Sequence, residues 1–178
     1  MNQEITKYID NKEFDLAFKL IVKEFHQSIY WQIRRMVLIH EDADDVTQNV
    51  FIKIYQHLNT FKSESKLSTW IFRITYNETI NFINKNAKEH HATFEDYSIE
   101  VVDHLATDEY YDGDEIDHKL QKALASLPEK QRTVFLMKYY DEMKYEQISE
   151  ILGTSVGALK ASYHHAVTKI KDFLDLEH

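Results

Sequence analysis

The sequence predicts an all-α protein made of two small helical domains joined by an acidic linker. Only three Gly and one Pro occur among 178 residues, which leaves few turn residues for a β architecture. Apolar residues recur at helical spacing in both halves of the chain. Between them, residues 93–118 contain ten acids and no Lys or Arg. We therefore expect domains at 1–92 and 119–178, with the linker at 93–118.

Three helices are expected in the first domain. The spans 14–38 and 43–58 each carry an apolar stripe wide enough to face a core. The span 67–85, which begins LSTWIFRITYN, carries more aromatic and apolar side chains than one stripe needs. Some of these rings are therefore expected at the surface, although for Trp70 or Phe72 taken singly a place in the core is favoured.

The tract 41-EDADD-45 lies in the first turn of the second expected helix. The positive end of the helix dipole favours acids there, and the tract lacks the ligand spacing of a calcium loop. We therefore expect no metal ion. Behind the acids, Asp44, Gln48, Phe51 and Tyr55 form a ridge beside the buried stripe.

The segment 145–171 predicts a helix-turn-helix in the second domain. Gly153 can adopt the left-handed conformation that ends one helix, and Ser155 can cap the next by accepting a backbone N–H bond. The second helix carries Lys160, Ser162, Tyr163, His164, Lys169 and Lys171 without one acid. Such a helix suits contact with DNA phosphates, whereas a plain helical hairpin would show the same apolar spacing.

The net charge of −9 is concentrated in the middle of the chain. Residues 1–92 hold twelve acids and twelve bases, and residues 119–178 hold eight acids and nine bases. A block as acidic as 93–118 is expected to repel itself rather than fold. It is either a solvated spacer or a segment that occupies a basic channel shaped for nucleic acid in a partner.

Composition and termini narrow the functional class. The chain has no Cys, which excludes disulfides and thiolate metal sites. Its polar N-terminus and the absence of a long apolar run predict a cytoplasmic protein without membrane insertion. Neither a phosphate-binding glycine loop nor a paired nucleophile and base occurs, so we expect no enzyme and no cofactor.

Two long tracts resemble the extracytoplasmic-function sigma factors of bacterial RNA polymerase. DADDVTQNVFIKIYQHLNTFKSESKLSTWIFRITYN, at 42–77, is similar to the second conserved region of that family. LASLPEKQRTVFLMKYYDEMKYEQISEILGTSVGALKASYHHA, at 124–166, is similar to the fourth. The two tracts occur in the order of the family and are separated by a variable linker. The resemblance implies RNA polymerase core, promoter DNA and an anti-sigma factor as partners.

The resemblance also implies three sets of site residues. Polymerase clamp helices would contact Asp44, Asp45, Gln48, Asn49, Phe51 and Ile52. The minus-ten promoter element, with one base flipped into a pocket, would contact Phe61, Lys62, Lys66, Trp70, Arg73 and Asn77. At the minus-thirty-five element, the helix that starts at Ser155 would enter the major groove, with Gly157 allowing close approach of a phosphate. Lys160, Ser162, Tyr163 and His164 would face the same DNA.

The recognition helix departs from the family pattern. VGALKASYHHAVT, at 156–168, lacks three arginines that the family commonly has there. Because bidentate arginine contacts are among the strongest in DNA recognition, promoter affinity or sequence is expected to differ. One alternative is a sigma-like adaptor that binds an anti-sigma factor without recognising DNA.

Overall fold

In the described part of the chain, every element of regular secondary structure is a helix, as the sequence predicts. The computed structural model describes residues 2–105, 107 and 113–176. The N-terminal half contains α1 (Asn2–Asp10), α2 (Phe14–Val37), α3 (His40–His57), the short 3-10 helix η1 (Leu58–Thr60) and α4 (Leu67–Glu89). The C-terminal half contains α6 (Glu115–Ala125), α7 (Glu129–Tyr139), α8 (Tyr145–Leu152) and α9 (Val156–Leu176), and α5 (Phe94–Leu105) lies between the halves.

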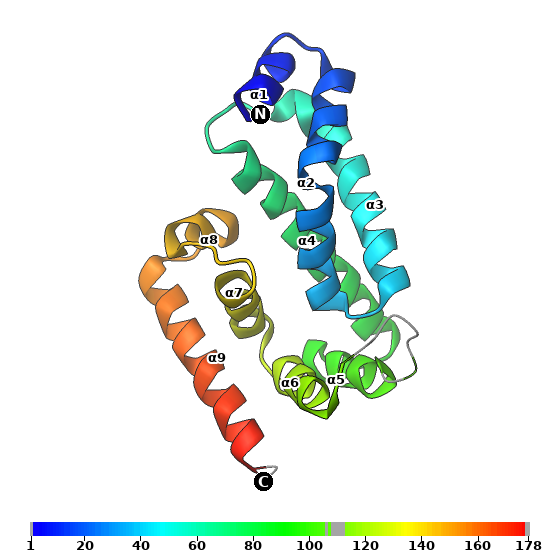
Figure 1. The fold of residues 1–178 in the computed structure, drawn as a ribbon, viewed down its shortest axis with the longest axis vertical. Helices are drawn as coiled ribbons and strands as arrows, with labels where there is room; N and C mark the ends of the chain where they lie inside the picture. The colour runs from blue at the N-terminus through cyan, green and yellow to red at the C-terminus, as the bar shows by residue number, and fades with distance from the viewer. Residues whose placement is uncertain (1, 106, 108–112, 177–178) are drawn as a thin grey trace.

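A bundle of long helices forms the N-terminal half. In Figure 1, α2, α3 and α4 run roughly alongside one another, and α1 covers one end. Ile29 and Ile33 of α2 and Ile54 of α3 are fully buried. Each such side chain contributes about 1.5–3 kcal/mol by leaving water, so this apolar layer fixes the bundle. The three long helices begin and end within a few residues of the predicted spans.

The helix-turn-helix of the C-terminal half forms as predicted. Gly153 has φ of +65°, the left-handed conformation that ends α8. The Ser155 hydroxyl accepts a hydrogen bond from the Ala158 backbone N–H at 3.3 Å, which caps the start of α9. Ile148, Ile151 and Leu159 are buried together with residues of α7. The turn therefore holds α8 and α9 on a shared core.

The prediction that residues 93–118 stay unfolded is wrong for 94–105. These residues form α5, which packs against α4 and α6. Phe94, Val102 and Leu105 are buried, whereas Asp96, Glu100 and Asp103 are exposed. The acids avoid mutual burial because the helix turns them to solvent. The C-terminal half starts with α6 at Glu115, inside the expected linker, and the part of that linker at 106 and 108–112 lies outside the described residues.

The two halves pack against each other, which the sequence did not predict. Helix α8 contacts α4, and α7 contacts α2. Two arginine side chains donate across this contact to backbone carbonyls, one from each half. The Arg73 guanidinium of α4 donates to the Glu150 carbonyl in the last turn of α8 at 2.6 Å. The Arg132 guanidinium of α7 donates to the Met36 carbonyl in the last turn of α2 at 3.0 Å.

An ion pair and a tyrosine complete this contact between the halves. Arg35 of α2 pairs with Asp141, which follows α7, and lies 5.2 Å from the ring centre of Tyr140. Tyr76 of α4 donates its hydroxyl hydrogen to Glu129 of α7 at 3.1 Å. Burial, and then the Glu129 carboxylate, raises the pKa of Tyr76 to about 12. Arg35 with Asp141, and Tyr76 with Glu129, are thus paired across the contact.

The two glycines of the helix-turn-helix provide a matched test of the turn. At Gly153, Ala has space but would adopt an unfavourable positive φ, so we expect Gly153→Ala to lower the free energy of unfolding by about 1–2 kcal/mol. At Gly157 a Cβ also meets open space but φ is ordinary, so Gly157→Ala should leave stability unchanged or raise it by up to about 1 kcal/mol. Urea denaturation measures both, and equal effects would contradict the assignment of the turn.

Asp141 predicts a pH dependence of stability. Burial raises the pKa of Asp141 to about 6, although the Arg35 guanidinium opposes this change. A pKa above the unfolded value of 3.8 means that the stability contributed by this carboxyl is complete below that value and is lost as pH rises through about 6. We expect Asp141→Asn to stabilise the protein by about 2 kcal/mol more at pH 7 than at pH 4.

The measurement is urea denaturation of the protein and of Asp141→Asn at intervals between these two pH values. Other carboxylates titrate equally in both proteins, so the difference isolates Asp141. A difference that stays constant with pH would show that the Asp141 carboxyl keeps its ordinary pKa.

Candidate nucleic-acid interface

Three residues of α9 form an exposed row suited to DNA. Gly157, Lys160 and His164 are spaced by three and four residues and are all exposed. The Lys160 ammonium lies 5.9 Å from the ring centre of Tyr145 and is therefore close to the start of α8. Open space surrounds the position that a Gly157 Cβ would occupy. Ser155 is also exposed, at the start of this row.

Tyr163 does not belong to that row. Its ring stacks on Phe135 with 5.7 Å between the ring centres and meets Tyr145 edge-on. Ser162 is half-buried. The sequence contained a signal for this placement, because Leu159, Tyr163 and Ala166 follow the spacing of the buried stripe. The Tyr163 ring is thus half-buried against the C-terminal half, and its contact with DNA stays a prediction.

The predicted minus-ten residues lie on α4 and on the loop before it. Lys62, Lys66, Arg73 and Asn77 are exposed. Phe61 and Trp70 are half-buried and contact each other, with their ring centres 5.3 Å apart. Cations and aromatic rings are thus close together, as single-stranded nucleic acid requires.

Part of this α4 surface is already occupied by the other half of the chain. Arg73 is hydrogen-bonded to α8, and the buried Thr69 hydroxyl lies 3.4 Å from a carboxylate oxygen of Glu150. The predicted minus-ten surface on α4 and the predicted minus-thirty-five surface on α9 therefore do not form one continuous face. Instead, α8 of the helix-turn-helix lies against the helix that carries Arg73 and Asn77.

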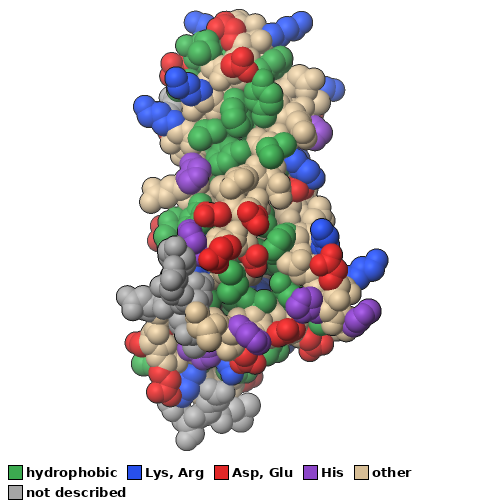
Figure 2. All heavy atoms as spheres, turned by 90° about the vertical axis from the view of Figure 1, so that its right-hand side faces the viewer, with side chains coloured by type: hydrophobic (Ala, Val, Ile, Leu, Met, Phe, Trp, Pro, Cys, Tyr) green, Lys and Arg blue, Asp and Glu red, His purple; other side chains and the backbone are tan. Residues whose placement is uncertain are grey.

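The residues predicted to contact polymerase lie along one side of α3. Asp44, Asp45, Gln48 and Asn49 are exposed, and Ile52 is 53% exposed although it is apolar. Figure 2 shows the right-hand side of Figure 1, where acidic side chains gather beside apolar ones. A surface of this kind combines polar contacts that fix register with apolar area that provides affinity.

Phe51 is the exception on α3. It is only 8% exposed, and its ring packs against Phe18 and His26. The Phe51 ring therefore belongs to the core, and its contact with polymerase stays a prediction. Leu16 and Tyr55 are 48% and 46% exposed apolar residues near the same end of the bundle. Leu16 was missed, although it lies off the apolar stripe of α2 in the sequence.

The acidic residues at the start of α3 lie close to one another and to His40. Burial raises the pKa of Asp42, and the nearby Asp45 and Glu41 carboxylates raise it further. Among the described residues, no group of three or more His, Asp or Glu side chains is placed to hold a metal ion. His40 lies 3.4 Å from Asp44 and forms a hydrogen bond of 2.7 Å with the Tyr30 hydroxyl.

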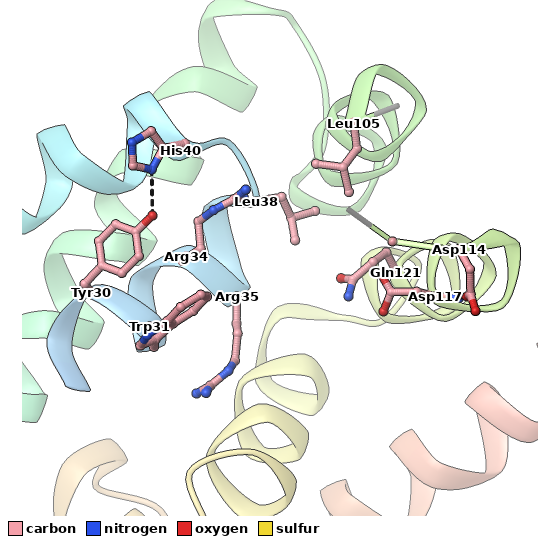
Figure 3. Close-up of a pocket in the computed structure, with 11 residues that line it drawn as sticks. Tyr30, Trp31, Arg34, Arg35, Leu38, His40, Leu105, Asp114, Asp117 and Gln121 are labelled. Atoms are coloured by element: carbon pink, nitrogen blue, oxygen red, sulfur yellow. Dashed lines mark hydrogen bonds between the residues drawn. The ribbon is translucent and has the colours of Figure 1, made fainter. Parts of the chain in front are cut away.

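Two grooves meet at Trp31, a residue that was not predicted to belong to a site. The larger groove has a volume of about 740 Å³ and lies between α2, α5 and α6 (Figure 3). The smaller, of about 500 Å³, lies between the two halves of the chain. Trp31 lines both and is 47% exposed. The only signal in the sequence is a Trp within the polar stretch QSIYWQIRR.

No helix in the described ranges is long and apolar enough to cross a membrane.

Comparisons with known proteins agree with the two halves seen in the structure. A family model described as Sigma-70 region 2 matches residues 21–89, and one described as Sigma-70, region 4 matches residues 117–170. The ECF RNA polymerase sigma factor SigW of Bacillus subtilis is 33% identical over 156 residues, covering 83% of both chains. The RNA polymerase sigma-H factor of Pseudomonas aeruginosa is 28% identical, covering 84% of this chain and 82% of that protein.

Two solved structures share the fold. CnrH in complex with the cytosolic domain of CnrY has a TM-score of 0.67 at 19% identity, covering 92% of this chain and 91% of that one. The sigma factor RpoE of Bartonella quintana, in complex with the anti-sigma factor NepR, has a TM-score of 0.66 at 20% identity, covering 90% and 98%. The family-model matches and the similarity to SigW show that this chain belongs to the extracytoplasmic-function sigma factors of bacterial RNA polymerase.

Proposed function

We propose that this sigma factor binds RNA polymerase core through α3, recognises the minus-ten element through α4 and its preceding loop, and recognises the minus-thirty-five element through α9. The observation that carries this proposal is the separation of the surfaces. The acidic and apolar side of α3 is exposed, and the row of Gly157, Lys160 and His164 is exposed on a different helix. One chain can therefore bind a protein and DNA at once.

The chemistry is binding rather than catalysis. Sigma factors are transcription factors and not a family of catalysts. A base flipped out of the duplex and held near Trp70 cannot return to its pair, so binding energy opens the DNA. Unstacking costs a few kcal/mol, which contacts to aromatic rings and charge-assisted contacts offset. Because polymerase links the two DNA surfaces, modest affinities at each multiply. Such a protein works in the cytoplasm, with polymerase, and needs no cofactor.

An anti-sigma factor is a further partner in this proposal. The solved structure of Bartonella quintana RpoE is a complex with the anti-sigma factor NepR, and that of CnrH is a complex with the cytosolic domain of CnrY. The groove of about 500 Å³ between the halves exposes Trp31 together with Arg35, Phe72 and Met143. An exposed tryptophan beside apolar and charged side chains has the composition of a protein-binding surface.

Transcription in vitro tests the proposal. Purified protein, bacterial core polymerase and genomic DNA are combined, and the start sites are mapped. We expect a discrete set of promoters that core alone does not use. A sigma-like adaptor without DNA recognition, which the missing arginines of α9 would favour, would neither bind core nor support initiation.

Ile52→Asp tests the polymerase surface. A carboxylate at this exposed apolar position removes the apolar contact and must be desolvated, so we expect core affinity to fall at least about tenfold. Ile52→Val keeps an apolar side chain and serves as the matched control. Binding of labelled protein to core measures both, and thermal denaturation confirms that both fold. Equal core affinity for Ile52→Asp and the control would remove Ile52 from the interface.

Lys160→Ala tests the recognition helix. A variant that neutralises one phosphate fewer also releases about one counterion fewer, so the slope of log affinity against log salt should become shallower by about one. The measurement uses holoenzyme and a mapped promoter fragment at several salt concentrations. Lys23→Ala, on the exposed side of α2, is the control and should keep the original slope. A slope unchanged in Lys160→Ala would mean that this lysine does not touch phosphate.

A further inference from the structure

We propose that Tyr30 and His40 are positioning residues for the polymerase contact, because together they hold the Asp44 carboxylate of α3 in one orientation. This inference rests on the function proposed above and deepens its polymerase surface. The Tyr30 hydroxyl of α2 lies 2.7 Å from His40 Nδ1, and His40 Nε2 lies 3.4 Å from a carboxylate oxygen of Asp44. A chain of three side chains therefore leads from α2 to a predicted polymerase contact.

Tyr30 is the fixed end of this chain. It is half-buried in α2, between the fully buried Ile29 and the exposed Trp31. Its ring meets the Trp31 ring edge-on at 5.4 Å and the His40 ring edge-on at 6.0 Å between ring centres. Figure 3 shows the Tyr30 hydroxyl directed at the His40 imidazole. Rings packed in this way leave the hydroxyl little freedom to move.

His40 lies directly after a strained turn between α2 and α3. Leu38 has a positive φ of +68°, a conformation that persists only where surrounding contacts hold it. The hydrogen bond from Tyr30 to His40 is one such contact. Ala43 and Val46 anchor α3 itself in the core, being 0% and 1% exposed. Loss of the hydrogen bond should therefore free the His40 side chain and leave the helix in place.

His40 extends the row of predicted polymerase contacts by one turn of helix. His40, Asp44, Gln48 and Ile52 follow one another at intervals of four residues, so their side chains lie along one side of α3. The His40 side chain is 28% exposed and that of Asp44 is 52% exposed. An Asp44 carboxylate held by His40 loses less rotamer freedom when a partner binds. Such preorganisation raises affinity without adding a contact.

The imidazole can hold Asp44 in either charge state, but the two states present different charges to a partner. A neutral ring that accepts the Tyr30 hydroxyl hydrogen at Nδ1 carries its own hydrogen on Nε2, which faces Asp44. The imidazolium carries hydrogens on both nitrogens, and its positive charge offsets that of the Asp44 carboxylate. Because an acidic surface complements a basic one, the imidazolium should weaken binding to polymerase.

Other charged groups surround His40, so its effect has to be separated from theirs. The titratable and charged groups that share its groove or its turn of helix are Tyr30, Arg34 and Arg35 of α2, Glu41, Asp42 and Asp44 of α3, and Asp114 and Asp117 of α6. All of them are present in variants changed at His40 alone. Comparison of such variants with the original protein therefore isolates the imidazole.

A double-mutant cycle tests the positioning role. We expect His40→Ala and Asp44→Asn each to weaken binding of labelled protein to core polymerase about threefold or more. The double variant should bind no more weakly than Asp44→Asn alone, because His40 acts through Asp44. Asp45→Asn is the matched control, and its effect should multiply with that of His40→Ala. Thermal denaturation checks that each variant folds. Independent, multiplying effects of His40→Ala and Asp44→Asn would overturn the proposal.

His40→Gln and Tyr30→Phe separate positioning from simple packing. The Gln amide can donate to Asp44 but does not titrate, so core affinity at about pH 8 should stay within about twofold of the original. Between about pH 8 and pH 6, the original protein should lose about threefold in affinity relative to His40→Gln. Groups of the polymerase titrate equally with both proteins. An affinity ratio that stays constant with pH would exclude an effect of the imidazole charge and refute this role.

Tyr30→Phe keeps the ring and removes the hydroxyl that orients His40. It should weaken core binding in the original protein but have no effect in His40→Ala. An equal effect in both backgrounds would mean that Tyr30 does not act through His40.

Failure of this inference is distinguishable from failure of the proposed function. If α3 is not the polymerase surface, Asp44→Asn and Ile52→Asp both leave core affinity unchanged. If only the positioning role is wrong, these two variants weaken core binding, whereas His40→Ala leaves it unchanged or acts independently of Asp44.

Discussion

Two arginines, each donating to the C-terminal end of a helix in the other half, orient the two halves on the apolar core that they share. Arg73 reaches α8, and Arg132 reaches α2. Helix C-termini present carbonyls without intrahelical partners, and a guanidinium supplies both charge and donors to them. Because the two bonds run in opposite directions, neither half can rotate far without breaking one. The smaller groove at Trp31, between the halves, and the contact of α8 with α4 both follow from these two hydrogen bonds.

The two crossing hydrogen bonds select one arrangement of the halves but stabilise that arrangement only weakly. The Arg132 guanidinium is buried against the Phe94 ring, 5.9 Å from its centre, yet lacks a carboxylate. At Arg35 a carboxylate is present, and burial still raises the pKa of Asp141. At both arginines, the free-energy cost of removing the charged groups from water cancels part of their electrostatic attraction. A contact built from such groups selects one geometry while remaining open to competition from a partner that offers better-hydrated or more complementary surfaces.

Local structure could be predicted from the sequence, whereas the packing between the halves could not. Helical spacing located α2, α3 and α4 to within a few residues, and Gly153 with Ser155 located the turn, because these signals act between neighbours along the chain. The acidic block was misjudged because its net charge hid an amphipathic pattern. Phe94, Ser98, Val102 and Leu105 recur at helical spacing and are the buried side of α5.

The candidate site shows the same division. Lys160 and Ile52 are exposed as expected, but Phe51 is buried and Tyr163 is half-buried, because their side chains follow the core-facing stripes of α3 and α9. Those two placements could have been found from periodicity alone. Contact between Arg73 and Glu150 could not, because 77 residues separate them and nothing local specifies the pairing. Contacts between residues far apart in the sequence depend on how well two whole surfaces are complementary.

Covering α4 also bears on the weak recognition helix. With Lys160 and His164 as the basic or titratable residues of its exposed row, α9 has little to hold DNA by itself. Arg73 of α4 is already bonded to α8, so in this arrangement the predicted minus-ten surface offers one phosphate contact fewer. Under the proposed function, polymerase joins the two DNA surfaces in one complex, where modest affinities multiply. The missing arginines of α9 and the occupied Arg73 of α4 act in the same direction, because each leaves less affinity for DNA in one surface alone.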